Sequence, residues 1–383
     1  MAKIFHAHLH GDRVTKYDRL IHSTISDTAW LEISPQTPFY LLIPQDTHLL
    51  KEYDQGWKIT EIMPVNSVGI VTGQDGKTIA FQKSDAELLA HEHNLSKSVV
   101  TQILYRPFDT RFIVYDSQVV TRPRGEVMRH MIAGKNLALI TSRLTKGETY
   151  QHAQVTQDIA EVICMSPKTS NNGFVFPLYT YPKTDVERAM KVSRCPNFSQ
   201  PFLKDLTDRL GYPPTPEAIF HYIYAIFHSP TYRSRYAEFL KIDFPRVPLT
   251  RNDALFRQLA TYGEELVALH LMKSAKLEQK SKHPQFVGQE GKCIVEPGHP
   301  KYEVKSRSVI NNKKGDRFTH VPEAVWNFYV GGYPVCAKWL KDRKGRTLSP
   351  QDIAHYQQIV VALGETITLM AAIDQAIPGF PIE

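Results

Sequence analysis

The feature that most constrains the fold is a change in hydrophobic periodicity near Pro182. From Pro38 to Tyr181, short apolar runs of strand length alternate with turn sequences such as the one at residues 74–77, Gln-Asp-Gly-Lys. After Pro182 the apolar residues recur at helical spacing, as in the segment at residues 252–273. These two patterns predict an α+β fold in which an irregular β-rich module precedes a mainly helical region.

The same patterns divide the chain into three parts: residues 1–35, which hold a short strand and helix; residues 36–182, the β-rich module; and residues 183–383, the mainly helical region with a small hairpin near 292–309. The strands expected in the second part cover residues 39–43, 68–72, 78–81, 99–105, 111–115, 137–141 and 174–181. The helices expected in the second and third parts cover residues 85–93, 125–133, 216–228, 232–241, 252–273 and 350–373.

Composition indicates a globular chain, because 42% of its 383 residues are hydrophobic. The four cysteines form no Cys-x-x-Cys pair, so neither a zinc knuckle nor a disulfide framework is indicated. No secretory signal and no apolar stretch of bilayer length stand out, and we expect a cytoplasmic protein without membrane contact.

Positive charge is unevenly distributed along the chain, whose formal net charge is +7. Residues 1–100 carry 9 Lys and Arg against 12 Asp and Glu, whereas residues 101–200 carry 13 against 8. In that second segment arginines, lysines and side-chain amides stand in loops between apolar runs, and these groups contact phosphates and base edges. The candidate DNA-binding residues are Arg106, Arg111, Arg122, Arg124, Arg129, Arg143, Lys146, Lys168, Ser170, Asn171 and Asn172.

Each group of candidates also has a structural interpretation. Arg106 and Arg111 flank Asp109 in a predicted tight turn, where an ion pair is as plausible as a phosphate contact. Asn171 lies in a polar turn that Gly173 could simply close. Both interpretations stay open from the sequence.

Catalytic motifs are missing from the chain. It has no glycine-rich phosphate loop ending in Lys-Ser or Lys-Thr and no Gly-x-Gly-x-x-Gly cofactor motif. Glu303 and Lys305 form a Glu-x-Lys pair of the kind used by metal-dependent nucleases, although such short patterns recur by chance. We therefore expect no catalytic residue, no metal and no cofactor, with a nuclease at Glu303 and Lys305 as an alternative.

Several longer segments carry a resemblance to a known family. The sequences Tyr-Arg-Pro-Phe-Asp-Thr-Arg at residues 105–111, Arg-Pro-Arg-Gly-Glu-Val-Met at 122–128, His-Ser-Pro-Thr-Tyr-Arg at 228–233 and Lys-Trp-Leu-Lys-Asp-Arg at 338–343 are among them. Together they resemble the C-terminal target-recognition region of type ISP restriction-modification enzymes and related adenine-specific DNA methyltransferases.

The resemblance implies sequence-specific recognition of duplex DNA, without catalysis by this chain. It further implies methyltransferase and nuclease domains in cis or in trans, to which S-adenosylmethionine, ATP and magnesium would belong. Residues 1–22 are similar to the segment that ends the methyltransferase fold in that family. A second alternative is an assembly or antirestriction decoy subunit that docks on a methyltransferase without touching DNA.

Overall fold

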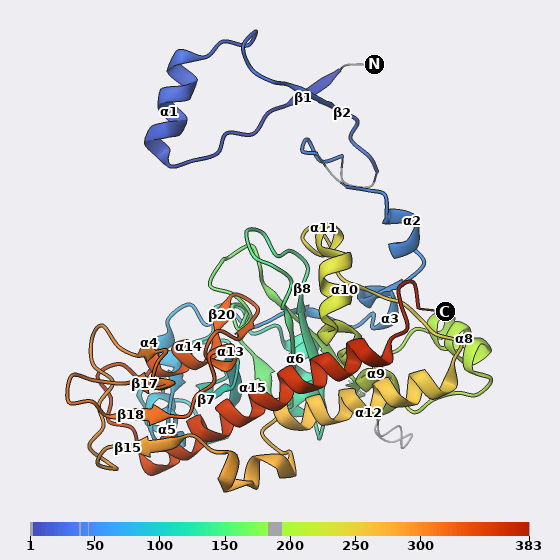
Figure 1. Cartoon of the computed structure of the whole chain (residues 1–383). Coiled ribbons are helices and arrows are strands. Elements are labelled where there is room, and N and C mark those ends of the chain that lie inside the picture. The colour runs from blue at the N-terminus through green and yellow to red at the C-terminus, as the bar shows by residue number, and fades with distance from the viewer. Residues whose placement is uncertain (1–2, 38–39, 45, 183–193, 383) are drawn as a thin grey trace. The chain divides into compact units, whose positions relative to one another are not determined.

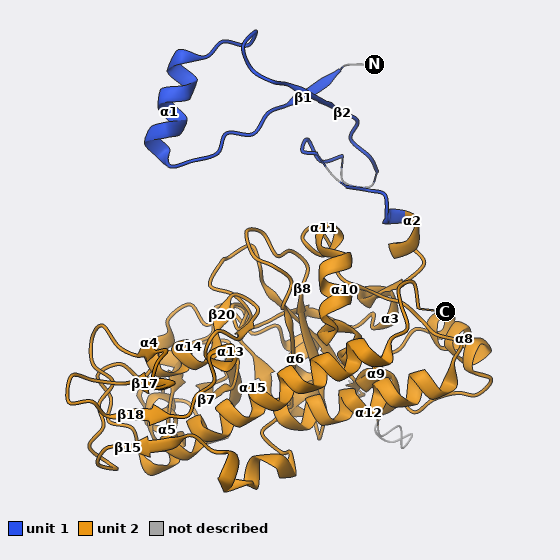
Figure 2. Ribbon diagram, in the orientation of Figure 1, with its two compact units in different colours: residues 1–50 blue, residues 51–383 orange. Residues whose placement is uncertain are grey.

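The computed structural model describes residues 3–37, 40–44, 46–182 and 194–382. It divides into two compact units, residues 1–50 and residues 51–383, which Figure 2 distinguishes by colour. The boundaries predicted at residues 35 and 182 stay predictions. The fold class of the chain is α+β, as the two periodicities indicated.

The first unit contains a two-stranded antiparallel sheet and one helix. Strands β1 (Ile4–His6) and β2 (Leu31–Ile33) pair, and α1 (Arg13–His22) lies between them in the chain. Asp12 caps α1 by accepting a hydrogen bond from the Thr15 backbone amide at 2.8 Å. The strand predicted at 39–43 does not form over residues 40–43, and Phe39 lies outside the described residues.

The second unit begins with two four-stranded sheets. In the first, β10 (Ile159–Ala160), β6 (Val100–Arg106), β7 (Asp109–Val114) and β5 (Ile79–Ala80) lie in that order. In the second, the order is β4 (Ser67–Val68), β11 (Gly173–Pro177), β8 (Ala138–Ser142) and β9 (Ala153–Thr156). Pairing in the second sheet is antiparallel throughout.

The described part of the second unit also contains three two-stranded sheets. They pair β3 (Trp57–Lys58) with β14 (Arg246–Val247), β12 (Tyr179–Thr180) with β13 (Cys195–Pro196), and β19 (Tyr329–Val330) with β20 (Tyr333–Pro334). The short helices around the sheets are α2 (Leu50–Tyr53), α3 (Ile59–Ile62), α4 (Asp75–Thr78), α5 (Lys83–Glu92), α6 (Gly125–Ile132), α8 (Gln200–Leu210), α10 (Pro230–Arg235), α11 (Ala237–Leu240), α13 (Glu323–Trp326) and α14 (Val335–Lys341).

Three long helices form the helical core, and Figure 1 shows them side by side: α9 (Pro216–His228), α12 (Asp253–His270) and α15 (Pro350–Ala376). Nine of the 13 positions of α9 are buried, and seven of them are consecutive, so this helix is surrounded by the rest of the unit. Its contact with α12 depends on Gly263, because a β-carbon there would come within 1.9 Å of the His221 carbonyl oxygen. The three helices therefore pack against one another, and α9 and α12 also contact β9 of the second sheet.

Helix α15 is long and apolar enough, by length and composition, to cross a membrane. This corrects the expectation that no segment approaches bilayer length. Within its most apolar stretch of 18 residues, 44% is buried inside the protein. Glu365 on the same helix forms an ion pair with Lys282, with 2.7 Å between Oε1 and Nζ. A core helix meets the same length criterion, and these contacts favour that role.

The predicted hairpin near 292–309 is part of a larger sheet. Its strands are β16 (Lys301–Glu303) and β17 (Ser308–Ile310), while residues 294 and 295 make only isolated bridges to residues 347 and 344. Strands β18 (Arg317–Thr319) and β15 (Gln285–Val287) extend the sheet in the order β15-β18-β17-β16. The turn between β16 and β17 is the one at residues 304–307.

Candidate nucleic-acid interface

Two loops that carry candidate DNA-binding residues lie together at one end of the second sheet. Strands β8 and β11 are antiparallel neighbours with Ser142 opposite Gly173, so the loop after β8 and the loop before β11 leave the sheet at the same end of the two strands. We call residues 143–152 and 164–172 the paired loops. Lys168 Nζ joins them by donating to the Gly147 carbonyl at 2.6 Å.

A single carboxylate, Glu148, holds the paired loops in register. It accepts hydrogen bonds from Ser166 Oγ at 2.9 Å, from Asn171 Nδ2 at 2.8 Å and from His152 Nε2 at 3.0 Å. Burial alone would raise the pKa of Glu148, but these donors outweigh burial and lower its pKa to about 2. Glu148 is therefore ionised at neutral pH. Its three donors are buried, so the carboxylate is a structural anchor.

Other elements flank the paired loops. The Thr145 hydroxyl donates to the Leu240 carbonyl at 3.3 Å at the end of α11, and Figure 1 shows α11 beside the loops at the end of β8. On the other side, the turn between β19 and β20 inserts Gly331, whose amide donates to the Gln151 carbonyl at 2.7 Å. A β-carbon on Gly331 would lie 1.8 Å from the Met165 carbonyl oxygen, so this turn fits against the loops only as glycine.

Most of the predicted residues in the paired loops face solvent. The Arg143 side chain is 52% exposed, and its Nε lies 3.2 Å from Asp243 Oδ1. Lys146, Lys168 and Ser170 are exposed, and Asn172 is half-buried. Asn171 differs, because it is fully buried and its amide is committed to Glu148 and to the backbone of Lys146. Its geometry favours the turn interpretation over base contact.

The residues before and on α6 form a second group. Arg122 is exposed, and Arg124 caps α6 in the left-handed region with φ of 53°. Arg129 donates to the Tyr181 carbonyl at 2.9 Å, which ties α6 to the strand end at residue 181. Arg122 is thus free to meet a ligand, whereas Arg129 has a structural partner.

Arg106 and Arg111 are buried in ion pairs. Arg106 pairs with Glu161 at 2.8 Å, and Arg111 pairs with Asp109 at 2.7 Å. Asp109 is 1% exposed and also meets Arg343 at 2.9 Å. Burial would raise the pKa of Asp109, but the two guanidinium groups outweigh it and hold the pKa below its usual value. These contacts favour the structural interpretation for both arginines.

Sequence reasoning missed two residues beside the paired loops. Lys241 follows α11, and its carbonyl accepts a hydrogen bond from the Thr145 amide at 3.3 Å. Tyr329 begins β19 and is 42% exposed, near the Gly331 turn. Nothing local in the sequence links the Gly-Gly-Tyr sequence at residues 331–333 to residues 143–152.

The structure gives little support to the alternative that Glu303 and Lys305 form a nuclease site. Glu303 and Lys305 lie exposed at the turn after β16, where Glu303 accepts a hydrogen bond from Ser306. Within the described residues, no group of three or more His, Cys, Asp and Glu side chains could hold a metal ion. The Glu-x-Lys pattern therefore lacks the further acidic ligands that such a site would use.

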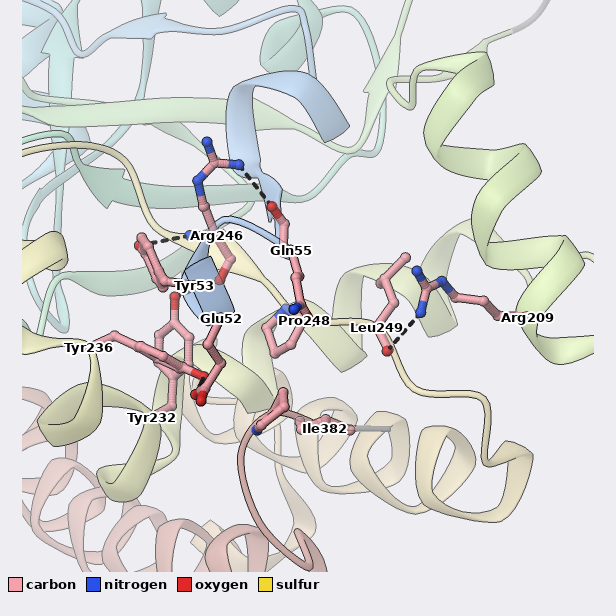
Figure 3. A pocket seen from close by; sticks show the side chains of 12 residues that line it. Glu52, Tyr53, Gln55, Arg209, Tyr232, Tyr236, Arg246, Pro248, Leu249 and Ile382 are labelled. Atoms are coloured by element: carbon pink, nitrogen blue, oxygen red, sulfur yellow. Dashed lines mark hydrogen bonds between the residues drawn. The ribbon is translucent and has the colours of Figure 1, made fainter. Parts of the chain in front are cut away.

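The small cavity in Figure 3 is also unsuited to a cofactor. It has a volume of about 60 Å³ and is lined by residues that include Tyr53, Tyr236, Arg246 and Ile382. Cofactor pockets usually hold about 300 to 1,000 Å³. Its polar groups bind one another, as where Tyr236 Oη donates to Glu52 Oε1.

The described fold is thus an α+β scaffold that presents cationic and amide-bearing loops at the edge of a sheet. The family model of the Type ISP C-terminal specificity domain matches residues 72–372, and the chain belongs to this family. A comparison with curated proteins found no match.

Three solved structures share the fold. A nuclease-deletion mutant of the Type ISP restriction-modification enzyme LlaGI, in complex with a DNA substrate mimic, matches with a TM-score of 0.70 and 18% identity over 97% of this chain and 38% of its own. A DrdV–DNA complex matches with a TM-score of 0.72 and 17% identity over 94% of this chain and 42% of its own. The ATP-dependent Type ISP restriction-modification enzyme LlaBIII, bound to DNA, matches with a TM-score of 0.70 and 17% identity over 97% of this chain and 27% of its own. The chain spans less than half the length of each of these proteins.

Proposed function

We propose that this chain recognises a specific sequence in duplex DNA on behalf of a restriction-modification enzyme and catalyses no reaction itself. The observation that carries the proposal is the pair of loops that Glu148 anchors, in a chain of the Type ISP specificity-domain family. A rigid framework with exposed cations and amides at its rim is what base-edge contact requires. The comparisons favour neither the decoy nor the nuclease alternative.

In this proposal, Arg143, Lys146 and Lys168 contact phosphates, and Ser170 and Asn172 reach base edges in the major groove. Arg122 and Arg124 contact the backbone at a second point. The fold-level similarity to proteins solved with DNA supports this assignment of partner.

The enzymatic partner in the proposal is an adenine-specific methyltransferase with a nuclease, in cis or in trans, in a bacterial cytoplasm. S-adenosylmethionine, ATP and magnesium would bind to that partner. The support for this part is the family and the share of the matched proteins that lies outside this chain.

The test is a binding selection from a random duplex library, repeated with the double variant Arg143→Gln/Lys146→Gln. We expect the wild-type chain to enrich one sequence, and the double variant to bind every duplex about 10-fold or more weakly near 0.15 M salt, because two phosphate contacts are lost and each contributes about 0.9 to the slope of log K against log salt concentration. The matched control is Lys83→Gln/Lys204→Gln, which removes two surface lysines that pair with Glu87 and Asp208. Failure of the wild-type chain to enrich any sequence would refute the proposal.

A further inference from the structure

The strongest positive charge of the chain lies outside the segment that the sequence analysis singled out. Residues 292–346 carry 12 Lys and Arg against 5 Asp and Glu, a net of +7 that equals the net charge of the whole chain. This stretch includes β16, β17 and β18, which Figure 1 shows at the end of the second unit away from α8. The β19–β20 turn within this stretch meets the paired loops, but no Lys or Arg lies between residues 318 and 337, so the cations stand outside that turn.

Six of these cations converge on one end of the small sheet. Three segments meet there: residues 292–301, which end at the first residue of β16, the turn between β17 and β18, and the residues after α14. We call the cations that they carry the basic end: Lys292, Lys301, Lys313, Lys314, Lys344 and Arg346. All six are exposed, and none forms an ion pair with an acidic residue of the described ranges.

The backbone beneath the basic end is rigid. The Gly345 amide donates to the Val295 carbonyl at 2.9 Å, and the Glu296 amide donates to the Asn311 carbonyl at 3.0 Å. Buried Asn312 adds a side-chain hydrogen bond to the Ile294 carbonyl at 3.2 Å. These hydrogen bonds therefore hold the backbones of the three segments next to one another.

The carboxylates near the basic end do not neutralise it. Glu296 accepts from the Lys313 backbone amide at 2.9 Å, and Asp316 accepts from the Asn312 side chain at 2.7 Å. Asp342, the first residue after α14, pairs with Lys338 and Arg111, and Glu290, two residues before Lys292, is exposed. Six cations against these four carboxylates leave an excess that repels itself and that a polyanion would relieve.

We infer that the basic end is a second, sequence-independent contact with the phosphodiester backbone of DNA. This inference rests on the proposed function and adds where and how the same ligand is held. Lysine is depleted from protein–protein interfaces, whereas exposed lysines that neutralise phosphates supply the salt-dependent part of DNA affinity. Five of the six cations are lysines, so the composition favours a nucleic-acid backbone over a protein surface.

The test is the salt dependence of binding for Lys313→Gln/Lys314→Gln/Lys344→Gln in the full chain. Each neutralised phosphate contributes about 0.9 to the slope of log K against log salt concentration, so three lost contacts lower the slope by about 2.7. Between 50 and 200 mM salt, the wild-type affinity for a random-sequence 30-bp duplex should therefore fall about 40-fold more than that of the triple variant. Preference for an enriched sequence should stay unchanged.

A matched control is Lys83→Gln/Lys97→Gln/Lys204→Gln, which removes the same charge from lysines paired with Glu87 and Asp208. The charge-preserving variant Lys313→Arg/Lys314→Arg/Lys344→Arg should keep the wild-type slope. If the triple glutamine variant unfolds, Lys314→Gln alone, at an exposed turn, should lower the slope by about 0.9.

An unchanged slope, in a chain that still selects a sequence, would overturn the inference and leave the proposed function standing. Lost sequence preference at constant slope would also overturn it, because the lysines would then contact bases. So would unchanged DNA binding with lost association to a protein partner. If the wild-type chain bound no duplex at all, the proposed function itself would fail.

Discussion

Removal of the Glu148 carboxylate should loosen both paired loops at once. Glu148→Ala leaves the side chains of Ser166, Asn171 and His152 without their shared acceptor, and all three are buried. Hydrogen bonds to a charged group contribute about 1.5 to 3 kcal/mol each, and buried donors left unpaired carry a further cost. Because water can enter the vacated space and the three bonds are not additive, we expect a loss of about 3 to 6 kcal/mol in the free energy of unfolding.

Glu148→Gln is the matched control for this change. Its amide oxygen can accept from His152 and Asn171 while its amide nitrogen donates to the Ser166 hydroxyl, so all three hydrogen bonds survive and only the charge is lost. Charge-assisted hydrogen bonds are about twice as strong as neutral ones, which predicts a smaller loss of about 1 to 2 kcal/mol.

The assay combines urea unfolding with duplex binding. Unfolding gives the stability of each variant, and the ratio of affinities for an enriched and a random duplex reports the loop arrangement. The alanine variant should lose most of this ratio at a salt concentration where the glutamine variant keeps it. A folded alanine variant with an unchanged ratio would refute the claim that Glu148 positions the recognising loops.

Three further predictions concern stability. The pKa of Glu148 is about 2 in the folded chain, against an ordinary value of 4.5, so the stability that its ionised carboxylate contributes is fully present above pH 4.5 and is lost as the pH falls towards 2. The difference in unfolding free energy between wild type and Glu148→Gln, measured in urea titrations, should therefore shrink over that pH range. Arg343→Met leaves buried Asp109 with one guanidinium partner and should cost about 3 to 5 kcal/mol, and a urea midpoint that does not move would contradict the buried ion pair. Gly331→Ala should destabilise the chain well beyond Gly345→Ala, since both have positive φ but only the first meets backbone, and equal thermal shifts would count against that contact.

The helical half of the fold was predictable because its signals are local. Thr215 caps α9 ahead of Pro216, Asn252 caps α12 and Ser349 caps α15, and each cap precedes an apolar run at helical spacing. The expected helices at 216–228, 252–273 and 350–373 agree with the observed ones to within a few residues. Helix α8, which lies within the predicted helical region, was missed.

The order of strands was not predictable, because pairing joins distant segments. Strand β10 pairs with β6 across more than fifty residues, and β4 joins β11 across about a hundred. Strand β9 was missed for a different reason. Its sequence, Ala-Gln-Val-Thr, alternates apolar and polar residues over only four positions, and all four are buried, including Gln154 and Thr156, so the burial does not follow that alternation.

The candidate site was predictable in its parts but not as an assembly. Both paired loops were expected to be polar and cationic, yet only the β8–β11 register brings them together. Glu148 is one acidic residue among many in the sequence, and nothing local marks it as their anchor. Asn171 satisfies the composition expected of a base-reading residue, while its burial depends on that same anchor.

The arginines and lysines of this chain differ in how their charge is used. Arg106 and Arg111 are paired inside the fold, because a planar guanidinium can meet a carboxylate and the face of Tyr105 at the same time. Lysines such as Lys146 and Lys314 stay in water as unpaired point charges. Counts of basic residues along the sequence therefore overstate the field of residues 101–200 and hide that of residues 292–346. Counterion release responds only to charge that DNA can reach, so the salt slope should follow the unpaired lysines rather than the buried arginines.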